Sequence, residues 1–270
     1  MYKKETFTAV ILFFILQICF AQSSFQNLEL GKNSLNYKGN PLKATDRKSL
    51  AFSDKGAWFG FGFLEQSEMQ GGFSGPFLMT EQNGVWLSSS FISLHLTDKN
   101  EQELIDWKTA LVNQNSYNSH LEQEFQNEKL EVKQQLVFSS GHSAIQKTSI
   151  TNRSSKTITL YPIYNSKTYL DNIQLSTEGQ FLKLVSSKSN AVGYIQFFNE
   201  GIDIVITKDS FTAKANKLTL KPNETKEIVV SQTYIFPQYD WKKENENLAK
   251  IQFNTVLKDT KKEKENLEKN

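Results

Sequence analysis

Between residues 22 and 237 the chain alternates short runs rich in Val, Ile, Thr, Phe and Tyr with polar clusters of Asn, Gly, Ser and Lys. The run Ser88–Leu96 shows this clearly, because His95 falls on one face of an extended strand and Leu94 and Leu96 on the other. Such runs favour β-strands bounded by turns. Almost no helical periodicity interrupts them, so the sequence predicts an all-β domain, a large antiparallel β-sandwich.

Three longer runs follow one another at residues 130–140, 143–152 and 156–165. Each is extended in character, and the breaks between them fall at Gly141 and at residues 153–155, which are polar turn formers. We therefore expect consecutive antiparallel strands joined by tight turns.

The pattern changes after Pro237, where the sequence predicts a charged linker helix and tail over residues 238–270. Trp241, Leu248 and Ile251 recur at spacings of three and seven, which is typical of one apolar helix face. That stripe is sparse and a charge-dense tail follows it. Two explanations stay open: the stripe packs against a partner outside the sandwich, or the helix lies solvated on the sandwich edge.

The first 21 residues predict a secretory signal peptide. Two lysines precede an apolar run from Ala9 to Leu16, and small Ala21 suits the cleavage site. The run is too short to span a membrane, which takes about 20 residues. The protein is therefore expected to be exported, to the periplasm or the extracellular space. Cys19 is the single cysteine and falls inside the segment expected to be removed, so no thiol chemistry or disulfide is expected.

Charge and motifs exclude several classes of function. The formal net charge of +2 over 270 residues gives no electrostatic footprint for nucleic acid. The three histidines show no zinc-ligand spacing, and no nucleotide-binding or serine-hydrolase motif appears. We expect no metal site, no cofactor and no catalytic residue in this chain.

The most distinctive segment reads FSDKGAWFGFGF from Phe52 and resumes as GGFSGPFLMTEQNGVWLS from Gly71. As a strand, it puts three phenylalanines on a core face and Trp58 on the opposite face, where Gly60 is expected to clear space around the ring. Aromatic rings stack on the apolar faces of sugars, and glycine lets a backbone approach a ligand closely. Trp58 therefore predicts a surface covered either by carbohydrate or by another domain.

Four further residues belong to this candidate surface. Gly72 and Phe73 lie in an expected loop of residues 71–76. Asn83-Gly84 favours a type I′ hairpin turn that would bring Glu81 near Trp86. Glu81 lies in an apolar context that could suit acid–base chemistry, although a solvated loop carboxylate is the simpler interpretation.

The same two stretches resemble the amino-terminal β-domain of bacterial glycoside hydrolases of family 63 and their relatives, which include processing α-glucosidases and mannosylglycerate-type hydrolases. The resemblance covers roughly residues 25–255. It implies a supersandwich, then a linker helix, then an (α/α)6 barrel that carries the catalytic carboxylates. This chain stops where that barrel would begin, so the family's acid and base have no counterparts here.

The resemblance leaves two hypotheses. The chain is the noncatalytic amino-terminal domain of an exported glycosidase, which contacts carbohydrate and packs on a helical catalytic domain in the same or a separate chain. Alternatively, it is a standalone carbohydrate-binding or adhesive β-sandwich. Under the first hypothesis the partner of the sparse helix stripe lies in the absent barrel.

Overall fold

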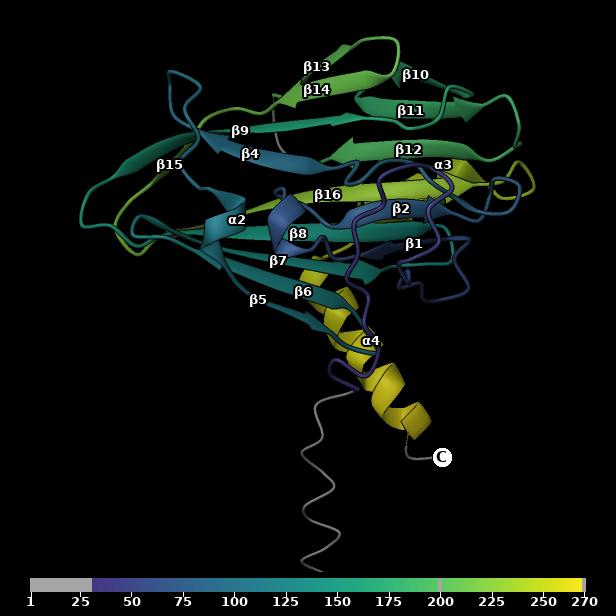
Figure 1. The fold of residues 1–270 in the computed structure, drawn as a ribbon, viewed down its shortest axis with the longest axis horizontal. Helices are drawn as coiled ribbons and strands as arrows, with labels where there is room; N and C mark the ends of the chain where they lie inside the picture. The colour runs from purple at the N-terminus through teal and green to yellow at the C-terminus, as the bar shows by residue number, and fades with distance from the viewer. Residues whose placement is uncertain (1–30, 199–200, 269–270) are drawn as a thin grey trace, which may run out of the picture.

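A computed structural model describes residues 31–198 and 201–268. The expected signal peptide and Cys19 lie outside the described residues. Three antiparallel sheets form the framework of the molecule (Figure 1). Within the described ranges, no helix is long and apolar enough to cross a membrane.

The largest sheet has eight strands in the order β10-β11-β12-β16-β8-β7-β6-β5. Their bounds are β5 Leu111–Ser116, β6 Leu121–Gln126, β7 Leu130–Phe138, β8 Ser143–Asn152, β10 Ile173–Glu178, β11 Phe181–Ser186, β12 Val192–Phe197 and β16 Thr225–Ile235. The second sheet comprises β4 Ser93–Thr97, β9 Ile158–Lys167, β13 Asp203–Ile206, β14 Ser210–Lys214 and β15 Leu218–Leu220. The third comprises β1 Phe59–Gly62, β2 Ser74–Leu78 and β3 Val85–Trp86.

The inner faces of the two larger sheets share one hydrophobic core. Phe197 from the eight-stranded sheet packs against Tyr164 and Phe211 of the five-stranded sheet, with ring centroids 4.9 and 6.3 Å apart. All three side chains are at most 5% exposed. Burial on facing sheets with alternating inward positions is the arrangement of a sandwich, so the predicted all-β sandwich is confirmed.

The prediction of consecutive hairpins is right for one pair and wrong for the next. β7 and β8 pair as expected, from Leu130 with Asn152 to Phe138 with Ala144. β9, however, crosses to the other sheet, where it pairs with β4, β14 and β15. The Asn152 side chain holds this crossing by donating to the carbonyls of Lys156 and Leu220. Polar turn residues mark where a strand ends but not which strand it pairs with.

The carboxyl-terminal segment forms two helices instead of one, α3 Trp241–Leu248 and α4 Phe253–Glu268. Asp240 caps α3 by accepting a hydrogen bond from the backbone N–H of Lys243. Figure 1 shows α4, in yellow, extending from the face of the eight-stranded sheet near β6, β7 and β8.

The apolar stripe of these helices packs on the chain's own sheet. Leu248, Phe253 and Leu257 form a second hydrophobic cluster with Val137 of β7 and Ile145 of β8. Val137 and Ile145 point away from the main core, because side chains alternate along each strand. The expectation that the partner of the stripe lies in an absent barrel is therefore wrong, and the stripe is not solvated on a sheet edge either.

The charge-dense part of α4 is also anchored. Lys264 pairs with Asp54, and Lys55 pairs with Glu263 at 3.0 Å. These contacts join the last turns of α4 to the loop that leads into β1, immediately before Trp58.

Candidate functional site

Trp58 precedes β1 and its side chain is 59% exposed, whereas Phe59 and Phe61 are buried. The predicted alternation of this strand is therefore confirmed at these positions. The Trp58 indole meets the ring of Phe236 edge-on, with centroids 6.4 Å apart and planes at 89°. Phe236 follows β16, so two segments distant in sequence fix the orientation of an exposed indole.

Further apolar side chains extend this surface. The backbone N–H of Tyr239 donates to the Phe236 carbonyl, and its half-exposed ring packs on His142 with centroids 4.2 Å apart. Met79, which is 38% exposed, donates its backbone N–H to the Trp58 carbonyl. We refer to Trp58, Phe236 and Tyr239 as the aromatic rim. Flat amphipathic rings on a rigid support are suited to contact with a sugar face or with a packed domain.

Gly60 does not clear space around Trp58. A Cβ atom at this position would lie 2.7 Å from the Phe52 carbonyl oxygen. Phe52 and Phe61 exchange two backbone hydrogen bonds, which bring the segment before β1 directly against the strand. Glycine is required here for close approach of backbone to backbone, not of backbone to ligand.

Gly72 and Phe73 also lie in the protein interior. The Gly72 carbonyl accepts a hydrogen bond from Gln123 Nε2 at 3.0 Å, and the Gly71 carbonyl accepts one from Gln134 Nε2 at the same distance. Both glutamines are fully buried on the inner face of the large sheet. Phe73 is 3% exposed and packs against Phe63. The expected ligand loop is therefore a buried segment hydrogen-bonded to the sheet.

β2 and β3 form a hairpin, but Leu78 pairs with Val85, so residues 79–84 make a longer loop in place of the predicted two-residue turn at Asn83-Gly84. The Gly84 N–H donates to the Glu81 carbonyl, so the turn spans residues 81–84, and Asn83 and Gly84 have φ values of 64° and 66°. Trp86 is 1% exposed, and its Nε1 donates to the Asp46 carbonyl at 3.0 Å. Glu81 is buried, with Asn172 Nδ2 3.4 Å from its Oε2.

Of the six predicted site residues, Trp58 alone presents its side chain to solvent. Phe73 and Trp86 lack the exposure that direct contact with a ligand requires, and Gly60 and Gly72 are packed against other backbone. Among the described residues, no group of three or more His, Cys, Asp or Glu side chains is arranged to hold a metal ion.

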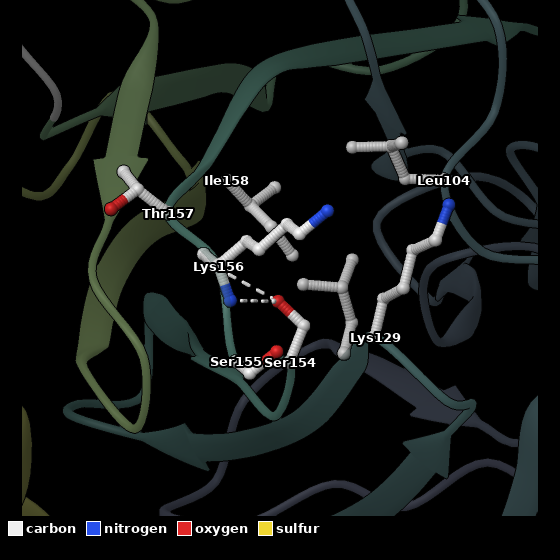
Figure 2. A pocket seen from close by; sticks show the side chains of 8 residues that line it. Leu104, Lys129, Ser154, Ser155, Lys156, Thr157 and Ile158 are labelled. Atoms are coloured by element: carbon white, nitrogen blue, oxygen red, sulfur yellow. Dashed lines mark hydrogen bonds between the residues drawn. The ribbon is translucent and has the colours of Figure 1, made fainter.

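The surface also contains hollows that sequence reasoning did not identify. One, of about 310 Å³, has an apolar floor formed by Leu104, Leu130 and Ile158. Figure 2 shows Lys129 and Lys156 flanking it, with Ser154 Oγ hydrogen-bonded to the backbone of Lys156. Its few hydroxyl groups lie at the turn, and the lysine side chains are exposed to solvent.

A larger hollow, of about 490 Å³, lies where β9 ends and β14 begins, beside the segment that leads into β4. We call it the hydroxyl groove, and it is lined by Gln70 and residues 88–90, 165–169 and 210–212. Seven of these lining residues are Ser or Thr. The run of three serines at 88–90 is the one sequence signal that could have drawn attention to it.

His95 lies close to this groove. Its Nε2 is 3.1 Å from Asn165 Oδ1, and its Nδ1 is hydrogen-bonded to Glu103. The Glu103 carboxylate raises the pKa of His95 above its ordinary value, although partial burial opposes this. The pair fixes the side chain of Asn165 at the groove wall.

Comparison with known proteins identifies a family that includes the aromatic and glycine segment of residues 52–88. Residues 39–192, more than half of the chain, match the family model described as the N-terminal domain of glucosidase YgjK. A search of curated proteins found no match.

Several solved structures resemble this chain at low sequence identity. A putative kojibiose phosphorylase from the human microbiome superposes with a TM-score of 0.55 and 10% identity, over 78% of this chain and 34% of that one. A polysaccharide lyase gives 0.48 and 9%, over 68% and 33%. A putative aldose 1-epimerase from Escherichia coli K12 gives 0.47 and 8%, over 67% and 97%. The chain thus spans about a third of the phosphorylase, and that likeness shows a common fold.

Proposed function

Because the chain belongs to the family of N-terminal domains of glucosidase YgjK, we propose that it is the noncatalytic amino-terminal domain of an exported glycoside hydrolase. The observation that carries this proposal is the Trp58 indole, which is 59% exposed and held at a right angle to Phe236. Trp58 lies within the residues 39–192 that match the family, whereas Phe236 follows them in the chain. Trp58 is joined by the exposed side chains of Met79 and Tyr239, and an exposed apolar patch of this kind marks an interaction surface.

The aromatic rim has two candidate occupants within this function. It provides a stacking surface for carbohydrate, and it provides a packing surface for a helical catalytic domain in the same chain or a separate one. Phe236 and Tyr239 lie between the end of β16 and the start of α3, where the chain leaves the sandwich. This position supports a role at a boundary between domains. The apolar run and the small residue near the amino terminus support the proposed export.

The domain alone should not hydrolyse glycosides. Glu81 is buried and faces the Asn172 amide, which leaves it poorly placed to exchange a proton with a substrate. Purified protein is assayed with aryl α-glucosides, and no turnover above the buffer rate is expected. Turnover that disappears in Glu81→Gln would contradict the noncatalytic role.

Carbohydrate contact at the rim is tested by calorimetric titration with soluble glucans. Trp58→Ala should weaken binding by about ten-fold or more, since it removes the exposed ring. Phe198→Ala is the matched control. Phe198 is also a partly exposed aromatic residue, but it lies at the opposite end of the β12–β16 strand pair from Phe236. Equal losses in both variants, or no heat with the unaltered protein, would count against a sugar-binding rim.

A standalone carbohydrate-binding or adhesive sandwich is the second candidate. The packing of Leu248, Phe253 and Leu257 on the chain's own sheet favours it, because the terminal helices need no further domain to bury their apolar stripe. The nucleotide sequence after the codon for Asn270 separates the candidates. A coding stretch for a helical barrel supports the glycosidase domain, and a stop codon followed by an unrelated gene supports the standalone protein.

A further inference from the structure

We propose that the hydroxyl groove is a second binding site, separate from the aromatic rim, and that its ligand is a neutral oligosaccharide. The choice of ligand class rests on the proposed function, but the site itself is argued from its own geometry. At about 490 Å³ the groove falls within the size range of small-ligand sites.

The groove offers hydrogen-bonding groups that the protein does not use. Gln70 Oε1 accepts a hydrogen bond from the Ser93 hydroxyl, and Asn165 Oδ1 is hydrogen-bonded to His95. These contacts at the oxygen atoms fix the orientation of both side-chain amide groups. Their NH₂ groups, and the hydroxyl of Thr212, have no partner among the described residues. Oriented amide and hydroxyl groups without partners match the alternating donors and acceptors of sugar hydroxyls.

The serines beside the groove are mostly satisfied within the protein, with one exception. Ser90 is 1% exposed, and its Oγ has no hydrogen-bond partner. Its neighbours are better satisfied, because Ser88 and Ser166 share a hydrogen bond between their hydroxyl groups and Ser166 also donates to the Ser90 carbonyl. The Ser90 Oγ lies on the side of Gly72, where a Cβ would be 2.7 Å from it, and so it does not face the groove. Contact with a ligand therefore falls to the amide groups of Gln70 and Asn165 and to the hydroxyl of Thr212.

The charge of the groove indicates a neutral ligand. Lys167 is the only charged lining residue, and its Nζ is paired with Asp209 Oδ2 at 3.0 Å. With its one cation neutralised, the groove has no surplus charge to bind a carboxylate, sulfate or phosphate. The hollow in Figure 2 differs in this respect, because it is flanked by two lysines and has an apolar floor.

Tyr169 supplies a rigid aromatic surface at the edge of the hydroxyl groove. Its hydroxyl donates to the Pro41 carbonyl at 2.8 Å and its backbone N–H donates to the Leu87 carbonyl, while the side chain stays 38% exposed. A ring held at both ends loses little freedom when a sugar stacks on it. The combination of a fixed ring and unpaired polar groups favours a saccharide over other neutral polar ligands.

The test uses the full chain on an array of neutral and anionic oligosaccharides, followed by titration with the best neutral glycan. Tyr169→Ala should weaken binding about ten-fold or more, and Thr212→Val and Gln70→Ala about three- to ten-fold each. Tyr169→Phe keeps the ring and should retain most of the affinity. Thr159→Val, the same hydroxyl deletion on β9 outside the groove, should change nothing.

Glycan binding by Trp58→Ala is measured in parallel, so that a site in the hydroxyl groove can be distinguished from a site at the aromatic rim. Loss of binding in the groove variants, with affinity retained in Trp58→Ala, supports a second site. Loss in Trp58→Ala alone overturns the groove site and leaves the rim as the sugar contact. Binding of anionic glycans only, or of none, also overturns the groove site. Circular dichroism of each variant confirms that the fold is intact.

Discussion

Gln134 Nε2 donates to the backbone carbonyl of Gly71 at 3.0 Å, inside the core of the sandwich. Gln134 also accepts from Gln123 at 2.7 Å, and Gln123 accepts in turn from Gln114. The three glutamines come from the adjacent strands β7, β6 and β5, so a row of amides crosses the inner face of the large sheet. This row binds the segment at Gly71 and Gly72 to the sheet.

Breaking this row should destabilise the protein strongly. Gln134→Met keeps the volume but removes the hydrogen bonds to the Gly71 carbonyl and from Gln123 Nε2. The Gly71 carbonyl keeps the Leu94 N–H and Gln123 keeps the Gly72 carbonyl, so the free energy of unfolding should fall by about 1–3 kcal/mol. Urea unfolding followed by circular dichroism measures the change. Gln126→Met on the exposed end of β6 is the control and should stay within about 0.5 kcal/mol. Similar stabilities for the two variants would rule out a structural role for the row.

The packing of α4 on the sheet gives a second prediction. Leu257 is 9% exposed and contacts the cluster around Val137 and Ile145, so Leu257→Ala should lower the free energy of unfolding by about 2–3 kcal/mol. Leu267, on the same helix and 65% exposed, provides the control variant Leu267→Ala. If Leu257→Ala unfolds at the same urea concentration as the unaltered protein, α4 does not dock as described.

Acid sensitivity is expected from Glu122 on β6. Burial alone would raise its pKa, but His120 at 3.8 Å, Lys133 at 2.9 Å and the Gln135 amide together hold the pKa at about 2. A carboxyl pKa below its unfolded value contributes stability above about pH 4.5, and this is lost as pH falls towards 2. The contribution is on the order of 3 kcal/mol.

The measurement is the free energy of unfolding as a function of pH. Between pH 4.5 and 2 the unaltered protein should lose more stability than Glu122→Gln, which has no carboxyl to protonate at this position. Glu128→Gln, in the exposed β6–β7 turn, should follow the unaltered protein. Parallel curves for all three proteins would show that Glu122 is not specially stabilised in its charged form.

The exposure of Trp58 is accessible to fluorescence quenching. Trp86 and Trp107 are at most 6% exposed and Trp241 stacks on Tyr194 at 3.9 Å, so iodide should quench mainly Trp58. Trp58→Phe should remove most of the quenchable emission, whereas Trp241→Phe should leave it. A quenching constant unchanged by Trp58→Phe means that the indole is covered in solution, as it would be in a self-associated protein.

The sequence predicted local features that depend on neighbouring residues. Alternation placed Phe59 and Phe61 in the core and Trp58 outside it, because side-chain direction along a strand has a period of two. The hairpin of β7 and β8 was predictable for the same reason, since Gly141 falls between two extended runs. The resemblance of residues 52–88 to one family of β-domains likewise needed only the order of aromatic and glycine residues.

The sequence could not reveal what the glycines of the aromatic segment, or the polar residues of the groove, pack against. Gly60 and Gly72 suggested room for a ligand, but only the tertiary structure shows that the carbonyl groups of Phe52 and Ile92 occupy that room. The hydroxyl groove escaped notice because Gln70, Asn165 and Thr212 are ordinary polar residues until three separate segments bring them together.

By itself, then, the amino-acid order determined the fold class, the strand faces and the exposure of Trp58, because local alternation fixes which side chains leave water. Tertiary structure alone decided that β9 crosses to the second sheet, that α4 covers β7 and β8, and that Trp86 is interior. Those outcomes depend on pairing and packing between segments far apart in the chain, and no local pattern encodes the partner of a given face.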